Sequence, residues 1–399
     1  MEQQPALVAV ELRDPERFGR DVAAIWTAGD AVLPVRSSRP KPEIGSILTA
    51  CRPSVYVRDG ERVPLEGAEP VASDTAVVLN TSGTTGAPKA VELSHGALAA
   101  AAAACHQRLN VTASDRWVCC VPLDHVAGFS ILVRSALLGQ KPLFTDPSDL
   151  GALASAEATL VSLVPTQLRR ALDAGIDLSH YRAVLVGGDA TPPALLQRAR
   201  EAGVDVVRTY GSTETGGGVV YDGIALEGVR VRISNQGHIE IASPTLMTRY
   251  RLAPGLTEMR FRDGWFDTGD VGELINGVLG VLGRSDGVVI TGGEKVAPIE
   301  VERLLVDHPV VAEAVVFGVD DEHWGQKVVA VVVPLPGESL SLPELRSFLD
   351  EKMARYKLPK EIFVTESIPR DDSGHADLPA LRRLASTLTP WNPRSEEPS

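Results

Sequence analysis

The chain has 399 residues, of which 44% are hydrophobic and 23% are charged, a composition typical of a folded protein. Its formal net charge of -13 provides no basic surface for a nucleic acid, and no apolar run reaches the ~20 residues that a membrane helix needs. No charged and then apolar leader opens the chain. We therefore expect a cytoplasmic protein without a nucleic-acid or membrane partner, and the length favours two domains of unequal size.

Residues 75–211 alternate short β-rich runs with helical runs. This order predicts an α/β fold whose strands pair mostly in parallel. Helix starts are marked by Ser94, by Thr166 after Pro165, and by the prolines Pro192 and Pro193. The cysteines lack the paired spacing of metal ligands, so we interpret all four as packing residues: Cys51, Cys105, Cys119 and Cys120.

The pattern changes after Gly218. Residues 229–243, "VRVRISNQGHIEIAS", alternate apolar and polar side chains around a glycine turn, which predicts an antiparallel hairpin. From about residue 286, helical runs at 299–309 and 342–353 and strand runs at 312–320, 327–335 and 361–367 predict a small α+β domain. The domains are therefore expected at 1–285, with mixed sheets, helices and a β-rich part, and at 286–399, with a disordered tail after about 385.

The first chemical motif is "LNTSGTTGAPKAVELSH", residues 79–95. Its glycines allow close approach to a ligand, and its hydroxyl and amide groups are natural phosphate donors. It is not a Walker loop, because neither serine nor threonine follows Lys89. Taken alone, the segment could equally be a flexible surface turn.

Three more motifs follow in order: "VVRTYGSTETGGG" at 206–218, "WFDTGD" at 265–270 and "GRSDGVVITGGEKVAPIEVE" at 283–302. Together the four motifs resemble the adenylate-forming superfamily, which includes acyl-CoA ligases, peptide-synthetase adenylation domains and luciferases. The resemblance covers about residues 75–383. Within it, "PLDHVAGFSILVRSALLG", "SLVPTQLRR" and the short front end look most like o-succinylbenzoate-CoA ligase.

Such enzymes join a carboxylate to ATP, releasing pyrophosphate, and then rotate the small domain so that the CoA thiolate attacks the acyl-adenylate. The resemblance therefore implies ATP, or AMP and acyl-AMP, together with Mg2+ and coenzyme A. The substrate would be a small-molecule carboxylate or acyl-adenylate. A carrier protein's phosphopantetheine stays an alternative acceptor, because it presents the same thiol arm as CoA.

The resemblance also implies roles for single residues. Thr84 and Lys89 would contact the pyrophosphate, Glu214 with Thr84 would bind Mg2+, and Tyr210 would stack on adenine. Asp270 and Arg284 would each bind the ribose diol through two hydrogen bonds. The full nucleotide set is Thr81, Ser82, Gly83, Thr84, Thr85, Gly86, Lys89, Gly187, Gly188, Asp189, Thr209, Tyr210, Gly211, Thr213, Asp270 and Arg284. Alternatively, Glu214 could be a helix N-terminal acid and Asp270 a turn acid.

The acyl pocket is expected at the helix 125–139 and the strand ends that follow it, with His125, Phe129, Gly188 and Gly211 in its wall. A histidine and a phenylalanine four apart on an apolar helix could equally be core residues. Arg134 need not share their face and could form a surface salt bridge. The glycines ending "TETGGG" favour a bulky, aromatic or cyclic acid.

The C-terminal part contains the pivot and the thiol channel implied by the resemblance. Asp286 would be the hinge residue, and the neighbouring Gly287 lowers the steric cost of large dihedral changes. Gly292 and Gly293 would leave space for the pantetheine arm during thioester formation. The same glycine pair could also be a plain hairpin turn.

The last motif departs from the family, which has Ser-Gly-Lys where this chain has Ser373-Gly374-His375. The lysine would bridge the incoming carboxylate and the α-phosphate, whereas histidine is shorter and mostly neutral at pH 7. Losing such a cation costs about 10²–10³-fold in rate. The preferred interpretation is an enzyme that only thioesterifies an acyl-adenylate made by a separate adenylating enzyme. The alternatives are a complete ligase that uses His375, Lys357 or Lys360, and an inactive nucleotide-binding regulator.

Overall fold

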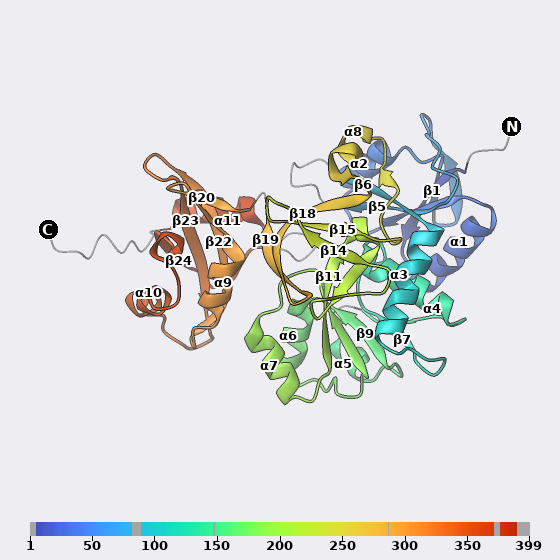
Figure 1. Cartoon of the computed structure of the whole chain (residues 1–399). Coiled ribbons are helices and arrows are strands. Elements are labelled where there is room, and N and C mark those ends of the chain that lie inside the picture. Colours follow the sequence, from blue (N-terminus) through green and yellow to red (C-terminus); the bar gives the residue numbers. More distant parts are fainter. Residues whose placement is uncertain (1–4, 82–88, 147, 286, 371–375, 389–399) are drawn as a thin grey trace. The chain divides into compact units, whose positions relative to one another are not determined.

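Figure 1 presents a computed structural model of the chain, which describes residues 5–81, 89–146, 148–285, 287–370 and 376–388. The described chain forms two compact units. The first contains the segments up to Ala190, Ala199–Arg232 and Glu240–Asp267, and the second contains Thr191–Arg198, Ile233–Ile239 and the chain from Thr268 onward. The domain boundary expected between residues 285 and 286 stays a prediction.

The first unit begins with a seven-stranded sheet in the order β16-β6-β5-β2-β1-β3-β4. Its strands are β1 Leu7–Leu12, β2 Ala31–Arg36, β3 Val55–Arg58, β4 Glu61–Pro64, β5 Thr75–Thr81, β6 Lys89–Ser94 and β16 Arg249–Tyr250. Strands β1, β2, β3 and β5 pair in parallel, while β6 runs antiparallel to both β5 and β16. The helices α1 Pro15–Thr27 and α2 Lys41–Cys51 connect the first strands, and Asp14 caps α1 by accepting the amides of Glu16 and Arg17.

A second seven-stranded sheet follows the predicted α/β alternation, in the order β13-β12-β11-β10-β9-β7-β8. Its strands are β7 Trp117–Cys119, β8 Leu143–Phe144, β9 Leu160–Leu163, β10 Ala183–Val186, β11 Val206–Ser212, β12 Gly217–Tyr221 and β13 Ile224–Ala225. Strands β7 to β11 pair in parallel, and β12 and β13 add antiparallel edges. Its helices are α3 His95–Arg108, α4 Val126–Leu137, α5 Leu150–Ala154, α6 Pro165–Asp173 and α7 Pro193–Glu201.

The helix starts agree with the signals in the sequence. Ser94 caps α3 by accepting the amide of Ala97 at 3.0 Å, and α6 and α7 begin at Pro165 and Pro193. All four cysteines are free and buried, as expected of packing residues. Burial raises the pKa of the Cys51, Cys119 and Cys120 thiols to about 12, so these thiols stay protonated at neutral pH.

The third sheet is β-rich, as predicted, and has the order β14-β15-β18-β17 with β19 on β18. Its strands are β14 Arg230–Ile233, β15 His238–Ala242, β17 Phe261–Arg262, β18 Trp265–Ile275 and β19 Val278–Arg284, and α8 Pro254–Arg260 precedes β17. The two strands of the predicted hairpin, β14 and β15, are neighbours. Strands β18 and β19 are joined by Asn276 and Gly277 at φ 51° and 81°, the left-handed values of a two-residue hairpin turn.

The remaining elements include the predicted α+β set of the C-terminal part, together with β20, β21 and α11. They are β20 Val289–Thr291, β21 Glu294–Val296, α9 Pro298–Val306, β22 Val311–Asp321, β23 Gly325–Pro334, α10 Leu342–Asp350, β24 Glu361–Val364 and α11 Leu378–Thr387. The sheet order is β21-β20-β23-β22, with β24 on β23. The buried apolar faces of α9 and α10 form one core with this sheet. In the part of the chain that is described, no helix has the length and apolar character needed to cross a membrane.

Candidate active site

The phosphate-loop motif is anchored by two antiparallel strands. Thr81 ends β5 and pairs with Lys89, the first residue of β6, and the Thr81 hydroxyl donates to the Lys89 carbonyl at 3.3 Å. Both ends of the loop are therefore held at one place on the sheet. The predicted phosphate contacts between them lie outside the described residues: Ser82, Gly83, Thr84, Thr85 and Gly86.

Several residues of the predicted nucleotide set lie at the carboxyl ends of β10 and β11. A Cβ on Gly187 would lie 2.2 Å from the Thr209 hydroxyl, and one on Gly211 would lie 2.0 Å from the Gly217 carbonyl oxygen. Neither position can hold a side chain. Gly188 has φ 87°, and Asp189 follows it. Ligands of parallel α/β sheets bind at this edge, where the backbone is accessible, so the arrangement suits a nucleotide base.

Glu214 lies just beyond the end of β11, in the short 3₁₀ turn Thr213–Thr215. Glu214 is thus an acid in the first turn of a 3₁₀ helix, and its role as a metal ligand stays a prediction. Its carboxylate Oε1 accepts a hydrogen bond from the Tyr250 hydroxyl at 2.8 Å, and its carbonyl accepts the Met247 amide at 2.8 Å. Mg2+ is typically held by one or two carboxylates together with substrate phosphates, and this carboxylate fits that need.

In the second unit, Asp270 on β18 and Arg284 on β19 face each other in the strand register. Their side chains form an ion pair at 3.3 Å, and Arg284 also donates to the Thr268 carbonyl at 3.2 Å. Asp270 lies within a strand, which excludes the alternative of a turn acid. The pair places carboxylate acceptors beside guanidinium donors, and the hydroxyl groups of a ribose diol can hydrogen-bond to both.

Of the four residues predicted for the acyl-pocket wall, His125 and Phe129 have different surroundings. His125 is the N-cap of α4 with a side chain 29% exposed, and it lies 4.0 Å from Asp124, which Arg36 and Arg39 bind. Phe129 is fully buried and packs edge-on against Phe18 and Trp26. The structure therefore gives Phe129 core partners, and its place in the wall stays a prediction.

For Arg134 the sequence left a surface salt bridge open, whereas the structure buries this residue to 5% exposure. Its guanidinium lies 5.1 Å above the Trp117 ring and 3.4 Å from the Tyr221 hydroxyl. Among the described residues, no carboxylate pairs with Arg134, and its Nε has no hydrogen-bond partner. Nearby, His106 Nε2 and Trp117 Nε1 are also buried without a partner. Burial, together with Arg134, lowers the pKa of His106 to about 4, so this histidine is neutral.

The C-terminal glycines form the turn between β20 and β21, where Thr291 pairs with Glu294. Gly292 has φ 58°, donates its amide to the Trp324 carbonyl at 2.9 Å, and would place a Cβ 3.1 Å from the Trp324 ring. Gly293 has open space around its Cβ position. The glycine pair therefore forms a hairpin turn in which Gly292 lies against the Trp324 ring, and its role in a thiol channel stays a prediction. The predicted hinge Asp286 and His375, which is expected at the position of the family lysine, lie outside the described residues.

The two lysines considered as replacements have partners within the second unit. Lys357 Nζ lies 2.5 and 2.7 Å from the two carboxylate oxygens of Glu300. Lys360 Nζ lies 4.9 Å above the centroid of the Trp324 ring. Using either lysine at the α-phosphate would first require breaking these contacts.

The model of the AMP-binding enzyme family matches residues 58–248, and that of the AMP-binding enzyme C-terminal domain matches residues 300–375. A probable 2-succinylbenzoate–CoA ligase of Mycobacterium tuberculosis is 39% identical over 365 residues, which are 86% of this chain and 94% of that protein. The chain belongs to the AMP-binding enzyme family. A 2-succinylbenzoate–CoA ligase of Bacillus subtilis is 34% identical over 75% of this chain and 67% of its own length.

Solved structures of AMP-binding enzymes lead to the same family. The o-succinylbenzoate-CoA synthetase of Bacillus subtilis, in complex with its acyl-adenylate intermediate, superposes with a TM-score of 0.83 and 28% identity, covering 98% of this chain and 90% of that one. ATP-bound MatB from Rhodopseudomonas palustris has a TM-score of 0.86 and 25% identity, covering 96% and 90%. The predicted fold class is therefore confirmed.

As a member of this family, the chain is an acid–thiol ligase, an acyl-CoA ligase of the o-succinylbenzoate-CoA ligase type. The predicted ligands are confirmed at the level of the family, since related structures hold AMP, or ATP with a magnesium ion, and the named reaction uses coenzyme A. The roles of single residues stay predictions. None of these relatives supports the preferred interpretation of an enzyme without an adenylation step; they favour the complete ligase.

Proposed function

We propose that this AMP-binding enzyme is a complete ATP-dependent acyl-CoA ligase whose acid is an aromatic dicarboxylate of the 2-succinylbenzoate kind. The observation that carries the choice of acid is the buried guanidinium of Arg134, which pairs with no carboxylate among the described residues. Relatives named 2-succinylbenzoate–CoA ligase align with most of the chain and support the same substrate class.

Burying a guanidinium without an anionic partner costs several kcal/mol, so its retention requires a compensating interaction. A dicarboxylate provides one, because one carboxylate is activated and the other remains charged. Arg134 is connected to the nucleotide edge through β12: it contacts Tyr221, whose ring lies 3.0 Å from a Cβ built on Gly218. Gly218 pairs with Gly211, which follows Tyr210. A Cβ on Gly211 would meet the Gly217 carbonyl and one on Gly218 the Tyr221 ring, so these glycines allow β11 and β12 to pack closely between Arg134 and Tyr210.

The two half-reactions follow from the residues assigned above. Lys89, Thr213 and Glu214 would hold the phosphates, with Mg2+ supplying positive charge there when it is bound. The free carboxylate oxygen attacks the α-phosphorus, forming the C–O–P linkage, while the α–β phosphoanhydride bond breaks and pyrophosphate leaves. The CoA thiolate then attacks the acyl carbon, the thioester forms, and AMP leaves with the electrons of the broken C–O bond.

The position of the family lysine is His375, and the complete ligase requires a cation there or near it. Lys357 is bound by Glu300, and Lys360 lies against Trp324, so neither is available without rearrangement. We therefore assign the role to His375, whose imidazolium is a shorter cation that can stand between two anions. This assignment implies slower adenylation than a lysine would provide.

The test separates the half-reactions. The protein is given 2-succinylbenzoate, ATP and Mg2+, and pyrophosphate release is followed; in parallel, synthetic acyl-AMP and CoA are supplied, and thioester formation is followed. We expect acid-dependent pyrophosphate release, slowed about tenfold or more by His375→Ala and accelerated by His375→Lys, with the second reaction unchanged. Thioester formation from acyl-AMP without any pyrophosphate release would restore the interpretation of a thioesterifying enzyme that depends on a separate adenylating partner. Absence of both reactions would indicate a regulator.

A further inference from the structure

The hydrogen bond from Tyr250 to Glu214 joins two segments that are far apart in the sequence. The Tyr250 hydroxyl donates to Glu214 Oε1 at 2.8 Å, and Tyr250 itself is only 3% exposed. Three residues earlier, the Met247 amide donates to the Glu214 carbonyl at 2.8 Å. The segment 247–250 therefore binds both the backbone and the side chain of Glu214.

The same segment is also bound to the strand that leaves the phosphate loop. Strand β16 pairs antiparallel with β6, with Tyr250 opposite Val91, and the Arg251 amide donates to the Ala90 carbonyl at 2.8 Å. Lys89, the first residue of β6, is only two positions from the partner of Tyr250. Strand β16 thus sets the spacing between Lys89 and Glu214, the two residues assigned to the phosphates.

A buried ion cluster holds β16 in this register. Glu92 on β6 is fully buried, and its carboxylate accepts from Arg251 at 2.9 Å and from Arg249 at 3.0 Å. Arg251 has no exposed side-chain surface and also donates to the Pro70 carbonyl at 3.1 Å. A two-residue strand is weakly specified by its backbone pairing alone, and a slip by one residue would turn Tyr250 to the other face. Such a slip would separate the buried charges, which is strongly unfavourable.

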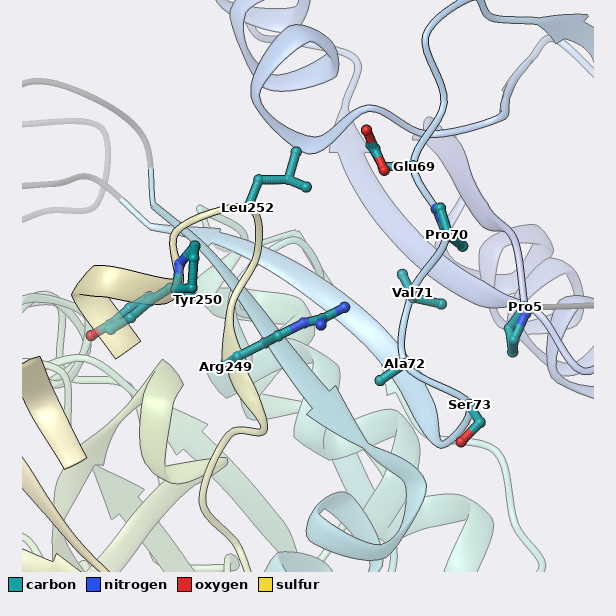
Figure 2. A pocket seen from close by; sticks show the side chains of 10 residues that line it. Pro5, Glu69, Pro70, Val71, Ala72, Ser73, Arg249, Tyr250 and Leu252 are labelled. Atoms are coloured by element: carbon teal, nitrogen blue, oxygen red, sulfur yellow. The ribbon is translucent and has the colours of Figure 1, made fainter. Parts of the chain in front are cut away.

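Figure 2 shows the surface recess next to β16, lined by Arg249, Tyr250, Leu252 and the segment from Glu69 to Ser73. In this view the Tyr250 ring extends away from Pro70 and Ser73, so that its hydroxyl lies at the far side from them. Glu214 is not among the residues that line the recess. The Tyr250 ring therefore lies between the recess and the Glu214 carboxylate, which the Tyr250 hydroxyl binds.

We propose that Tyr250 is a positioning residue for Glu214: its hydroxyl holds Oε1 and leaves Oε2 for the divalent cation at the phosphates, in a register set by the Glu92–Arg251 pair. The proposal rests on the function proposed above, because it takes Glu214 as the metal ligand. The hydroxyl of Tyr250 acts on the metal only through Glu214, so it should matter for adenylation, which uses the cation, and not for thioester formation.

The test is Tyr250→Phe, which removes the hydroxyl and keeps the ring. Binding of Mn2+ to the complex of the protein with α,β-methylene-ATP is measured by electron paramagnetic resonance, which detects the free ion. This measurement does not require the enzyme to turn over. We expect the Mn2+ Kd to rise about tenfold, as for loss of a hydrogen bond to a charged group, and the Mg2+ concentration for half-maximal pyrophosphate release to rise with it. Thioester formation from acyl-AMP and the thermal midpoint should change little.

Tyr181→Phe is the matched control, because it deletes the same atom from a buried tyrosine whose hydroxyl donates to the Leu153 carbonyl at 2.6 Å. It should leave Mn2+ binding unchanged. In a Glu214→Gln background, Tyr250→Phe should have no further effect on Mn2+ binding, since the two residues act as one unit.

Two results would overturn the proposal in distinguishable ways. If Glu214→Gln weakens Mn2+ binding and Tyr250→Phe does not, the positioning role fails while the proposed function stands. If Glu214→Gln also leaves Mn2+ binding intact, both the positioning role and the assignment of Glu214 fail. Equal weakening of Mn2+ and AMP binding by Tyr250→Phe, with a lower thermal midpoint, would show a merely structural role and refute the proposal.

Discussion

Replacement of Arg134 by methionine should lower activity with the dicarboxylate and leave the stability of the ligase nearly intact. Methionine keeps most of the volume of the side chain but removes the charge. Truncating one partner of a buried, hydrogen-bonded charge pair costs about 2–5 kcal/mol. At 1.36 kcal/mol per factor of ten, kcat/KM for 2-succinylbenzoate should fall by about 30-fold to several thousandfold.

The effect on folding should be small or of opposite sign. Methionine forfeits the contact with the Trp117 ring at 5.1 Å and the long 3.4 Å hydrogen bond to Tyr221, together about 1–2 kcal/mol. The substitution also removes the free-energy cost of burying a cation that has no carboxylate partner among the described residues, which is several kcal/mol. The free energy of unfolding of the ligand-free protein should therefore stay the same or increase.

The assay compares kcat/KM for 2-succinylbenzoate with that for two monoacids, 4-oxo-4-phenylbutanoate and 2-butanoylbenzoate, each lacking one of the two carboxylates. The wild type should prefer the diacid strongly, and Arg134→Met should lose this preference without losing activity on the monoacid that it accepts. Arg134→Lys keeps the charge and should lose less. Equal loss with diacid and monoacid, accompanied by lower stability in urea, would mean that Arg134 supports the fold and does not bind the acid.

Three further predictions concern the other contacts. Asp270→Ala should weaken AMP binding more than tenfold by removing the partner of Arg284 and a charge-assisted contact to the ribose; calorimetry that finds unchanged affinity would remove Asp270 from the site. Gly292→Leu should block thioester formation and spare AMP binding, because a Cβ at this position would lie 3.1 Å from the Trp324 ring and the backbone has a left-handed φ of 58°. Equal loss of thioester formation and AMP binding would instead point to misfolding. Asp115→Asn should lower the free energy of unfolding at pH 7 by about 2 kcal/mol, since hydrogen bonds from Arg182, Thr112 and Thr159 outweigh burial and lower the pKa of Asp115 from 3.8 to about 2. A carboxyl whose pKa is lower in the folded state stabilises the protein at pH values above its unfolded pKa. The difference in the free energy of unfolding between wild type and variant, measured in urea, should therefore shrink as the pH falls from 5 to 3. A difference that stays constant over this range would contradict the role of the charge.

The element order and the outline of the nucleotide edge could be predicted without coordinates, because both depend on local chemistry. Ser94, Pro165 and Pro193 mark helix starts through hydrogen bonds and dihedral limits that involve only the next few residues. The glycines at 187 and 211 stand in motifs that predict close backbone approach, and the structure leaves no room for a Cβ at either.

The roles of Arg134 and Tyr250 could not be predicted in this way. The helical periodicity predicts that Arg134 and Phe129 lie on different faces of the helix. It does not predict that Trp117 and Tyr221 contact the Arg134 guanidinium. Glu214 and Tyr250 are 36 positions apart, and Glu92 and Arg251 are 159 apart. No local pattern couples such residues, because their contact depends on how separate strands and turns pack. Local propensity thus placed the helices, strands and glycine turns of this ligase, whereas the partners of its buried charges were set by packing between segments that are distant in the chain.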